Sequence, residues 1–162
     1  MEKYLLILAI LIAASYIYLK LAIKYKIIDK PNERSSHTKI TVRGGGIIFT
    51  FSIILFFLFN NFQYPYFVIG VVIIAIVSFL DDIYTLSSKI RFPFQILAIA
   101  LILLQGDLLN MPLYLSLIYL ILGVGFVNMF NFMDGINGIT GIYSLSVLLG
   151  IYYVNDFEQI VN

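Results

Sequence analysis

The sequence predicts an all-α fold: a polytopic integral membrane helix bundle of about six transmembrane helices. Of the 162 residues, 61% are hydrophobic and 12% are charged, whereas a soluble domain carries about 25% charged residues. The apolar runs approach the roughly 20 helical residues that cross a bilayer core of about 30 Å. They are continuously apolar and do not alternate with polar residues, so a β-barrel is disfavoured.

Six apolar runs define the predicted spans. They cover residues 4–23, 46–62, 66–80, 92–109, 113–127 and 139–154. We expect one membrane domain over residues 1–162, because the longest polar segment is too short to build a core of its own. The first run continues past Ala13-Ala14-Ser15 and its positive charges follow it. We therefore expect a retained anchor, since a signal peptide carries its charge before a shorter apolar core.

The basic residues lie on one side of these spans. Eight of the ten Lys and Arg residues fall in segments 24–45 and 81–91, and none falls in the connections 60–65 and 105–112. Because cytoplasmic loops are enriched in Lys and Arg, we expect loops 24–45, 81–91 and 128–138 in the cytoplasm. The third loop has no basic residue, so its placement follows from the number of spans.

Composition also excludes several classes of function. The basic residues are few and lie mainly beside the membrane segments, so nothing supports binding to nucleic acid. The chain has no cysteine, which excludes a disulfide framework, a thiol nucleophile and a thiolate metal site.

An acidic pair, Asp81 and Asp82, directly follows the third apolar run. Acids at the C-terminus of a helix oppose its dipole, at a cost of a few tenths to about 1 kcal/mol. Ionisable groups near membrane depth indicate a functional site by default. The alternative is that the pair only marks the membrane interface.

Amide and carboxylate groups recur at every third residue of the third polar stretch, at Asn128, Asn131, Asp134 and Asn137. This spacing keeps them on roughly one face of a helix. Such oxygen-bearing side chains could bind a hard cation or hydrogen-bond a sugar or a base. The alternative is a cytoplasmic turn with an asparagine cap and glycines that serve packing.

The first loop ends in Arg43, Gly44 and Gly45, immediately before an apolar run. Backbone N–H groups at a helix N-terminus form an anion site, and an arginine can fork onto a phosphate. His37 is the only histidine. The alternative is that the basic residues only orient the chain and the glycines only pack.

Together, the three stretches indicate phosphoryl transfer. Carboxylates at a membrane face suit Mg²⁺, which binds through one or two carboxylates plus substrate phosphates. Basic and glycine-rich elements suit the phosphates, and phosphoryl transfer requires mostly positioning and charge neutralisation.

The chain resembles the polyprenyl-phosphate N-acetylhexosamine-1-phosphate transferase family, of the glycosyltransferase family 4 type, and within it the undecaprenyl-phosphate GlcNAc-1-phosphate transferases. The resemblance extends from Asp29 to about Gly141. Its motifs are Asp29-x-Pro-Asn-x-Arg-x-x-His37 with Arg43-Gly-Gly45, then Asp81-Asp82 with Leu86-Ser87, Arg91 and Gln95, and finally Asn128-x-x-Asn-Phe-Met-Asp-Gly-Ile-Asn-Gly138.

The resemblance implies a reaction, partners and a location. The enzyme would transfer a sugar-1-phosphate from a UDP-N-acetyl sugar to a polyprenyl (undecaprenyl) phosphate and release UMP, with Mg²⁺ as cofactor. This step would initiate a cell-envelope polysaccharide or cell-wall glycan. The protein would lie in the inner (plasma) membrane, in contact with the lipid bilayer, with its active site facing the cytoplasm.

The resemblance also implies roles for individual residues. Asp134 would coordinate Mg²⁺, Asp82 would support the metal and phosphate site, and Asp81 would deprotonate or orient the lipid phosphate. The remaining predicted site residues would bind substrate, along the nucleotide-sugar cleft or near its cytoplasmic mouth. These are Asn128, Asn131, Asn137, Arg43, His37, Gly44 and Gly45.

The chain departs from the family pattern at one site residue and in its number of spans. The family often has an aspartate where this chain has Asn137, and an amide cannot act as nucleophile or base. Family members have about ten or eleven spans and a later histidine motif. We therefore expect the chain to correspond to an N-terminal half, which works with a C-terminal half or a homodimer partner.

The sequence leaves two alternative functions open. One is a catalytically inert membrane fragment or subunit, and the other is a small cation channel or transporter. A channel would need acids distributed through the depth of the bilayer, whereas those of this chain cluster at one face.

Overall fold

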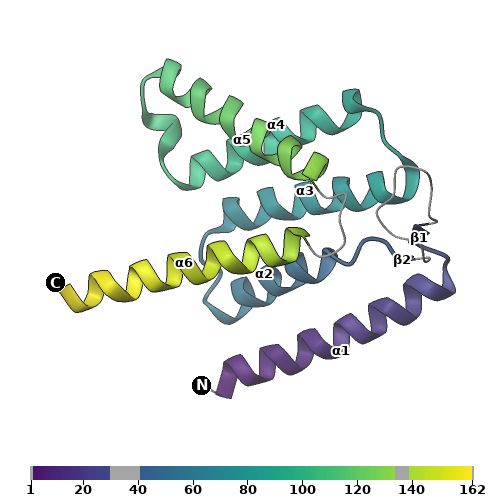
Figure 1. Ribbon diagram of the computed structural model, residues 1–162. Coiled ribbons are helices and arrows are strands. Elements are labelled where there is room, and N and C mark those ends of the chain that lie inside the picture. Colours follow the sequence, from purple (N-terminus) through teal and green to yellow (C-terminus); the bar gives the residue numbers. More distant parts are fainter. Residues whose placement is uncertain (1, 30–40, 134–138, 162) are drawn as a thin grey trace.

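The computed structural model describes residues 2–29, 41–133 and 139–161 (Figure 1). Over these residues the chain is almost entirely helical. The helices are α1 (Glu2–Lys24), α2 (Ile47–Phe59), α3 (Pro65–Tyr84), α4 (Ser88–Gln105), the 3₁₀ helix η1 (Leu108–Asn110), α5 (Leu113–Met133) and α6 (Ile139–Val161). Two short strands, β1 (Ile28–Asp29) and β2 (Thr41–Val42), lie between α1 and α2.

The expected all-α membrane bundle is confirmed. Within the described residues, α1, α3, α4 and α5 are each long and apolar enough to cross a membrane, whereas α2 and the apolar part of α6 are shorter. That the whole chain is one domain stays a prediction.

Several helices extend beyond the apolar runs that predicted them. Helix α3 continues to Tyr84 and α5 to Met133, while α4 already begins at Ser88. Asp81, Asp82 and Asn128 are therefore helical and not loop residues. Helical hydrogen bonds join backbone groups, so polar side chains do not end a helix. The helix continues into the polar interface and ends where other donors satisfy its last carbonyls.

Each helix packs mainly against the next one in the sequence, in the order α1, α2, α3, α4, α5. Helix α3 lies between the α1–α2–α6 side and the α4–α5 side of the molecule (Figure 1). Helix α6 contacts α5 near their connection, where the rings of Phe130 and Tyr143 lie 5.4 Å apart. Successive helices are antiparallel, so the C-terminal ends of α1, α3 and α5 lie at the same end of the bundle as the N-terminal ends of α2, α4 and α6 (Figure 1).

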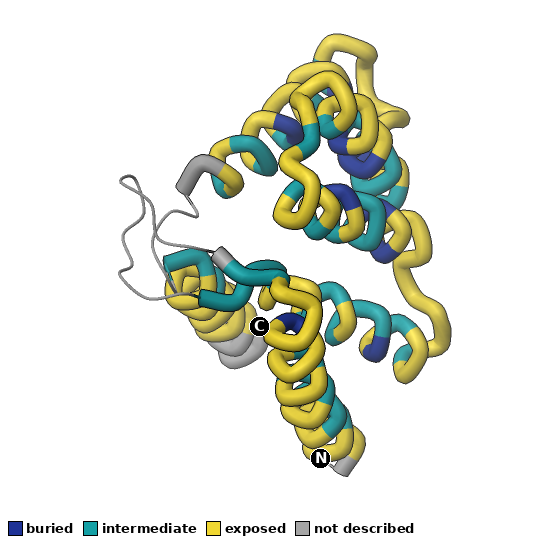
Figure 2. The backbone as a smooth tube through the Cα atoms, turned by 90° about the vertical axis from the view of Figure 1, so that its right-hand side faces the viewer, coloured by how far each residue is buried: buried dark blue, intermediate teal, exposed yellow. Residues whose placement is uncertain are grey.

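The small core lies where α3, α4 and α5 meet. Ile99, Leu103 and Val124 are buried there, and Figure 2 shows how few positions are buried elsewhere. A Cβ on Gly70 would lie 2.7 Å from the Ala98 carbonyl oxygen. This absence of a side chain is what lets α3 approach α4, as small residues do in membrane bundles.

Most large apolar side chains face outward, including those of Leu113, Ile121 and Tyr153. In water this surface would be unfavourable, but lipid removes the penalty because hydrocarbon tails are as apolar as these side chains. The outer face is therefore consistent with a chain whose solvent is the bilayer.

A short antiparallel ladder brings the first polar stretch back to the bundle. Ile28 pairs with Val42 and Asp29 with Thr41, and the Arg43 N–H donates to the Ile27 carbonyl at 3.1 Å. The ladder thus holds Arg43 close to the end of α1.

Candidate active site

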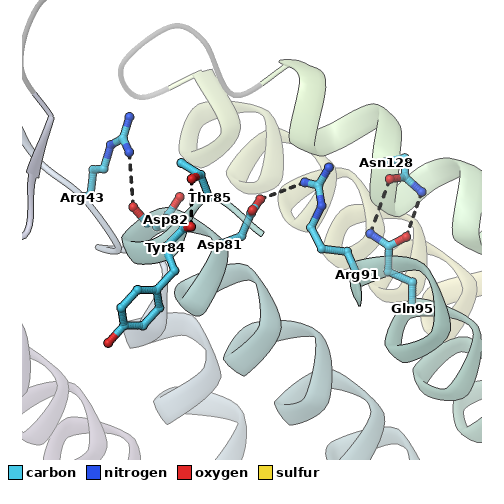
Figure 3. A network of polar contacts seen from close by, with 8 residues as sticks. All are labelled: Arg43, Asp81, Asp82, Tyr84, Thr85, Arg91, Gln95 and Asn128. Atoms are coloured by element: carbon cyan, nitrogen blue, oxygen red, sulfur yellow. Dashed lines mark hydrogen bonds and ion pairs between the residues drawn. The ribbon is translucent and has the colours of Figure 1, made fainter. Parts of the chain in front are cut away.

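Polar side chains form a row across one end of the bundle. From Arg43 the row passes to Asp82 and Asp81 on the last turn of α3, then to Arg91 and Gln95 on α4 (Figure 3). It continues to Asn128 on α5 (Figure 3). The row lies where the ends of α3 and α5 meet the start of α4. Residues from all three predicted polar stretches therefore lie in one region.

Arg43 joins the first polar stretch to the acidic pair. Its Nη1 donates to the main-chain carbonyl of Asp82 at 3.2 Å, while the Asp81 carbonyl accepts the Thr85 N–H at 2.8 Å. The last carbonyls of a helix need such donors, and a cation there also complements the negative end of the dipole. Arg43 thus stabilises the turn on which the carboxylates stand.

Arg91 holds the first carboxylate of the pair. Its Nη1 lies 2.8 Å from Asp81 Oδ2, and the two side chains are 21% and 22% exposed. Arg91 Nε is buried and has no hydrogen-bond partner among the described residues. The guanidinium therefore offsets the charge of Asp81, while its buried Nε stays unpaired among the described residues.

Gln95 and Asn128 pair through their side-chain amides. Asn128 Nδ2 donates to Gln95 Oε1 at 3.0 Å, and Gln95 Nε2 donates to Asn128 Oδ1 at 3.4 Å. Amide hydrogen bonds between membrane helices contribute about 0.6 kcal/mol on average and up to about 1.7 kcal/mol. The pair ties α4 to α5 one turn beyond Arg91.

Gly44 lies in a close contact between three elements. Its φ is +72°, and an added Cβ would overlap the Tyr18 hydroxyl and the Phe79 ring. The Tyr18 hydroxyl in turn donates to the Arg43 carbonyl. Packing and a left-handed backbone therefore require glycine here, whatever its role toward an anion.

The other glycines of this turn are open. An added Cβ would meet nothing within 4 Å at Gly45 or at Gly46, which is the N-cap of α2. The N–H groups of Ile47, Ile48 and Phe49 donate to the carbonyls of Gly44, Gly45 and Gly46 at 3.0–3.3 Å. The substrate-binding roles of Gly44 and Gly45 stay predictions.

The fit of the described residues to Mg²⁺ is partial. No three acidic or histidine side chains come together among residues 2–29, 41–133 and 139–161. Asp81 and Asp82 supply carboxylate oxygens on one helical turn, and Mg²⁺ usually takes one or two carboxylates and completes its shell with phosphates and water. The described residues thus supply two of the carboxylates of a Mg²⁺ site and not a complete set of protein ligands.

The remaining predicted residues divide into two groups. Asn131 is exposed on the last turn of α5. His37, Asp134 and Asn137 lie outside the described residues.

Three residues of the site were not predicted as site residues. Arg91 and Gln95 belong to a motif of the family resemblance, and a basic residue beside a membrane span is explained equally well by the orientation of the chain in the membrane. Tyr18 lies in an apolar run, where nothing distinguishes it from the aromatic residues typical of membrane interfaces.

The sequence of this chain is similar to known proteins of one family. Residues 64–161 match the model of glycosyl transferase family 4. Over 148 residues the chain is 27% identical to a probable undecaprenyl-phosphate N-acetylglucosaminyl 1-phosphate transferase of Bacillus subtilis (strain 168), covering 80% of this chain and 40% of the relative. No solved structure matches the chain.

A second relative is an undecaprenyl-phosphate alpha-N-acetylglucosaminyl 1-phosphate transferase of Yersinia pestis, 32% identical over 144 residues. That match covers 75% of this chain and 38% of the relative. The chain thus spans about two fifths of the length of either curated relative. The family model includes the acidic pair, Arg91, Gln95 and the third polar stretch. This chain belongs to glycosyl transferase family 4.

Proposed function

We propose that the chain forms the acidic-pair side of an enzyme that transfers a sugar-1-phosphate from a UDP-N-acetyl sugar to undecaprenyl phosphate and releases UMP. The product, a polyprenyl-diphosphate sugar, would initiate a cell-envelope polysaccharide or cell-wall glycan. The proposal is supported by the two relatives, a probable undecaprenyl-phosphate N-acetylglucosaminyl 1-phosphate transferase and an undecaprenyl-phosphate alpha-N-acetylglucosaminyl 1-phosphate transferase.

One observation carries the proposal: a carboxylate held by an arginine stands beside a second arginine at the common end of three membrane helices. The first pair is Asp81 with Arg91, and the second arginine is Arg43, bonded to the turn of Asp82. Phosphoryl transfer between two anionic substrates needs this combination, since cations stabilise the phosphates and a carboxylate orients the attacking oxygen.

Each carboxylate has its own role in the proposal. Asp81, fixed in direction by Arg91, accepts a proton from the lipid phosphate or orients it. Asp82 and Asp134 hold Mg²⁺, which neutralises phosphate charge when it is bound. Asn131, Asn137, His37, Arg43 and the open backbone at Gly45 bind the nucleotide sugar.

The location is part of the proposal. The site faces the cytoplasm of an inner (plasma) membrane, because five described basic residues lie at this end of the bundle and cytoplasmic loops are enriched in Lys and Arg. They are Lys24, Lys26, Arg43, Lys89 and Arg91. A nucleotide sugar reaches the site from that side, while the lipid phosphate reaches it from the bilayer.

The test uses proteoliposomes that contain undecaprenyl phosphate, Mg²⁺ and UDP-N-acetylglucosamine labelled in the sugar. Two proteins are compared: this chain, and a chimera in which it replaces the matching segment of the Bacillus subtilis relative. We expect the chimera to release UMP and to transfer label to the lipid. Asp81→Asn should lower this rate at least about 10²-fold, the loss typical of removing one charge-stabilising group from an active site.

The matched control is Asp107→Asn, because Asp107 lies between α4 and η1 at the opposite end of α4. It should retain the full rate. A folded chimera that is inactive while the parent relative is active would contradict the proposal. So would an Asp81→Asn chimera that is as active as the unmodified one.

A further inference from the structure

We propose that Asn128 is a positioning residue and not a substrate ligand: with Gln95 it forms an amide clamp between α4 and α5 that sets the position of Arg91 and, through it, of the Asp81 carboxylate. The inference rests on the proposed function for its catalytic consequence. Its structural content, the clamp itself, stands independently.

The hydrogen-bonding capacity of Asn128 is largely used within the fold. A side-chain amide offers two N–H donors and one carbonyl oxygen. Asn128 Nδ2 donates to Gln95 Oε1 at 3.0 Å and to the Val124 carbonyl at 2.9 Å. Its Oδ1 accepts from Gln95 Nε2 at 3.4 Å. A substrate could use the donors only by displacing these partners.

The partner of Asn128 is shielded from any ligand. Gln95 is 6% exposed, so its amide would be a buried and unsatisfied group without Asn128. Leaving a buried polar group unpaired is costly, which ties the two residues to each other. Asn131, one turn later, is exposed and remains accessible to substrate.

The clamp lies directly after a missing backbone hydrogen bond in α4. Arg91 and Gln95 are four residues apart, so they lie on the same face of the helix. Pro93, between them, lies inside α4. It has no N–H to donate to the carbonyl four residues earlier, so the turn that carries Arg91 is held less firmly by its own helix. The amide pair fixes the helix directly after this interruption.

The position of α4 also affects the Asp81 carboxylate. Arg91 contacts Asp81 at 2.8 Å, so a shift of the first turn of α4 moves the guanidinium relative to the carboxylate. Displacements of about 1 Å in an active site can reduce a rate by about 10²-fold. The clamp therefore acts on the reaction without touching the substrate.

The decisive experiment exchanges the two amides. Gln95→Asn alone leaves the pair one methylene too short, and Asn128→Gln alone makes it one methylene too long. The double variant Gln95→Asn/Asn128→Gln restores the combined length. In the transferase assay we expect each single variant to lower kcat about 10- to 100-fold, at unchanged KM for UDP-N-acetylglucosamine, and the double variant to recover most of the rate.

A ligand role for Asn128 predicts a different pattern. Every Asn128 variant would then raise KM, Gln95→Asn would be nearly silent, and the exchange would not restore the rate. That result would overturn the inference. The clamp instead predicts strongly non-additive effects of Gln95→Asn and Asn128→Gln, as for residues that act as one unit.

A second readout does not depend on activity. Because the chain has no cysteine, spin labels attach only where cysteines are introduced. Lys89→Cys on the first turn of α4 and Met129→Cys on α5 are both at exposed positions. Dipolar EPR on this labelled pair should show a broadened or shifted distance distribution in each single amide variant and the original one in the exchanged pair.

The matched control is Gln105→Asn. Gln105 is the other glutamine of α4, and its Oε1 accepts the Tyr66 N–H at 3.1 Å at the far end of the helix. It should leave the label distance unchanged. Unaltered distances in Gln95→Asn and Asn128→Gln would overturn the clamp. Loss of the clamp's signature and loss of transferase activity are thus measured separately, so failure of one proposal is distinguishable from failure of the other.

Discussion

Arg91 Nη1 lies 2.8 Å from Asp81 Oδ2 and thereby joins the first turn of α4 to the last turn of α3. Only residues 85–87 separate the two helices, so the ion pair closes a tight corner of the bundle. The corner carries a carboxylate that would otherwise oppose the helix dipole without compensation. The ion pair with Arg91 offsets the unfavourable interaction between the Asp81 carboxylate and the dipole of α3.

The first prediction concerns Arg91. Arg91→Ala should lower the transferase rate about 10- to 100-fold, because Asp81 loses the group that fixes its direction. Arg91→Lys should retain part of the activity, since lysine keeps the charge but not the planar fork. Initial-rate measurements of UMP release would test both variants. Lys89→Ala is the control, since Lys89 is exposed on the same turn; an equal loss there would indicate a general effect of charge.

The second prediction concerns the metal. Asp82→Asn removes the carboxylate but keeps the backbone carbonyl that Arg43 caps, so the turn should remain intact. We expect the Mg²⁺ concentration for half-maximal rate to rise at least about tenfold, as when a metal's ligand shell is weakened. Chelation with EDTA should abolish activity, and added Mg²⁺ should restore it. An unchanged Mg²⁺ dependence would remove Asp82 from the metal site.

The sequence predicted the helices well and their ends less well. Apolar runs identify spans because lipid admits only segments whose backbone groups are paired internally. They do not mark where a helix ends, since polar residues continue it as far as donors reach its last carbonyls. Asp81 and Asp82 were for this reason expected in a loop, and they lie within α3.

The gathering of residues from the three polar stretches at one end of the bundle was predicted, but their contacts were not. Alternating spans were enough to place the polar stretches at one end. The pairing of Gln95 with Asn128 depends on how α4 and α5 slide and rotate against each other. That register includes local contacts such as the close approach of Gly123 to Ile99, which no hydropathy pattern encodes.

The third prediction tests the packing of the first polar stretch. Gly44→Ala places a side chain at φ +72° and against Tyr18 and Phe79. A left-handed conformation alone costs an L-residue about 1–2 kcal/mol, so the free energy of unfolding should fall by at least this amount. Thermal unfolding in detergent, followed by circular dichroism, would measure it. The neighbouring Gly45→Ala should change stability by no more than about 0.5 kcal/mol, because its Cβ would meet nothing within 4 Å.

The fourth prediction tests the contact between α3 and α4. Gly70→Ala should destabilise the protein by about 1–3 kcal/mol, as overpacking does, because the added methyl would meet the Ala98 carbonyl at 2.7 Å. Backbone cannot yield as a flexible side chain can. Gly125→Ala, on α5 with open space around it, should be neutral or stabilising, since alanine is the better helix former by about 1 kcal/mol. Equal effects of the two substitutions would contradict the close approach of α3 and α4.

The fifth prediction concerns α2, whose length is marginal for a span. At 13 residues it rises about 20 Å, whereas a bilayer core is about 30 Å thick. The contacts nevertheless require it to run along α3: Arg43, before α2, bonds to Asp82 at the end of α3, and Gln63, after α2, is two residues from the start of α3. The two ends of α2 therefore belong to opposite membrane faces, with the neighbouring loop residues supplying the missing length.

Cysteine accessibility in the cysteine-free chain tests whether α3 crosses the membrane, and with it the faces to which the two ends of α2 belong. Gln63→Cys and Ser87→Cys are both at exposed positions, at opposite ends of α3. In intact cells a membrane-impermeant maleimide should label Gln63→Cys only, and in inverted vesicles Ser87→Cys only. The reverse labelling would place the acidic pair outside the cytoplasm, where no nucleotide sugar is made, and would contradict the proposed function. Labelling of both from one side would mean that α3 does not cross the membrane, despite 20 residues of sufficient hydropathy.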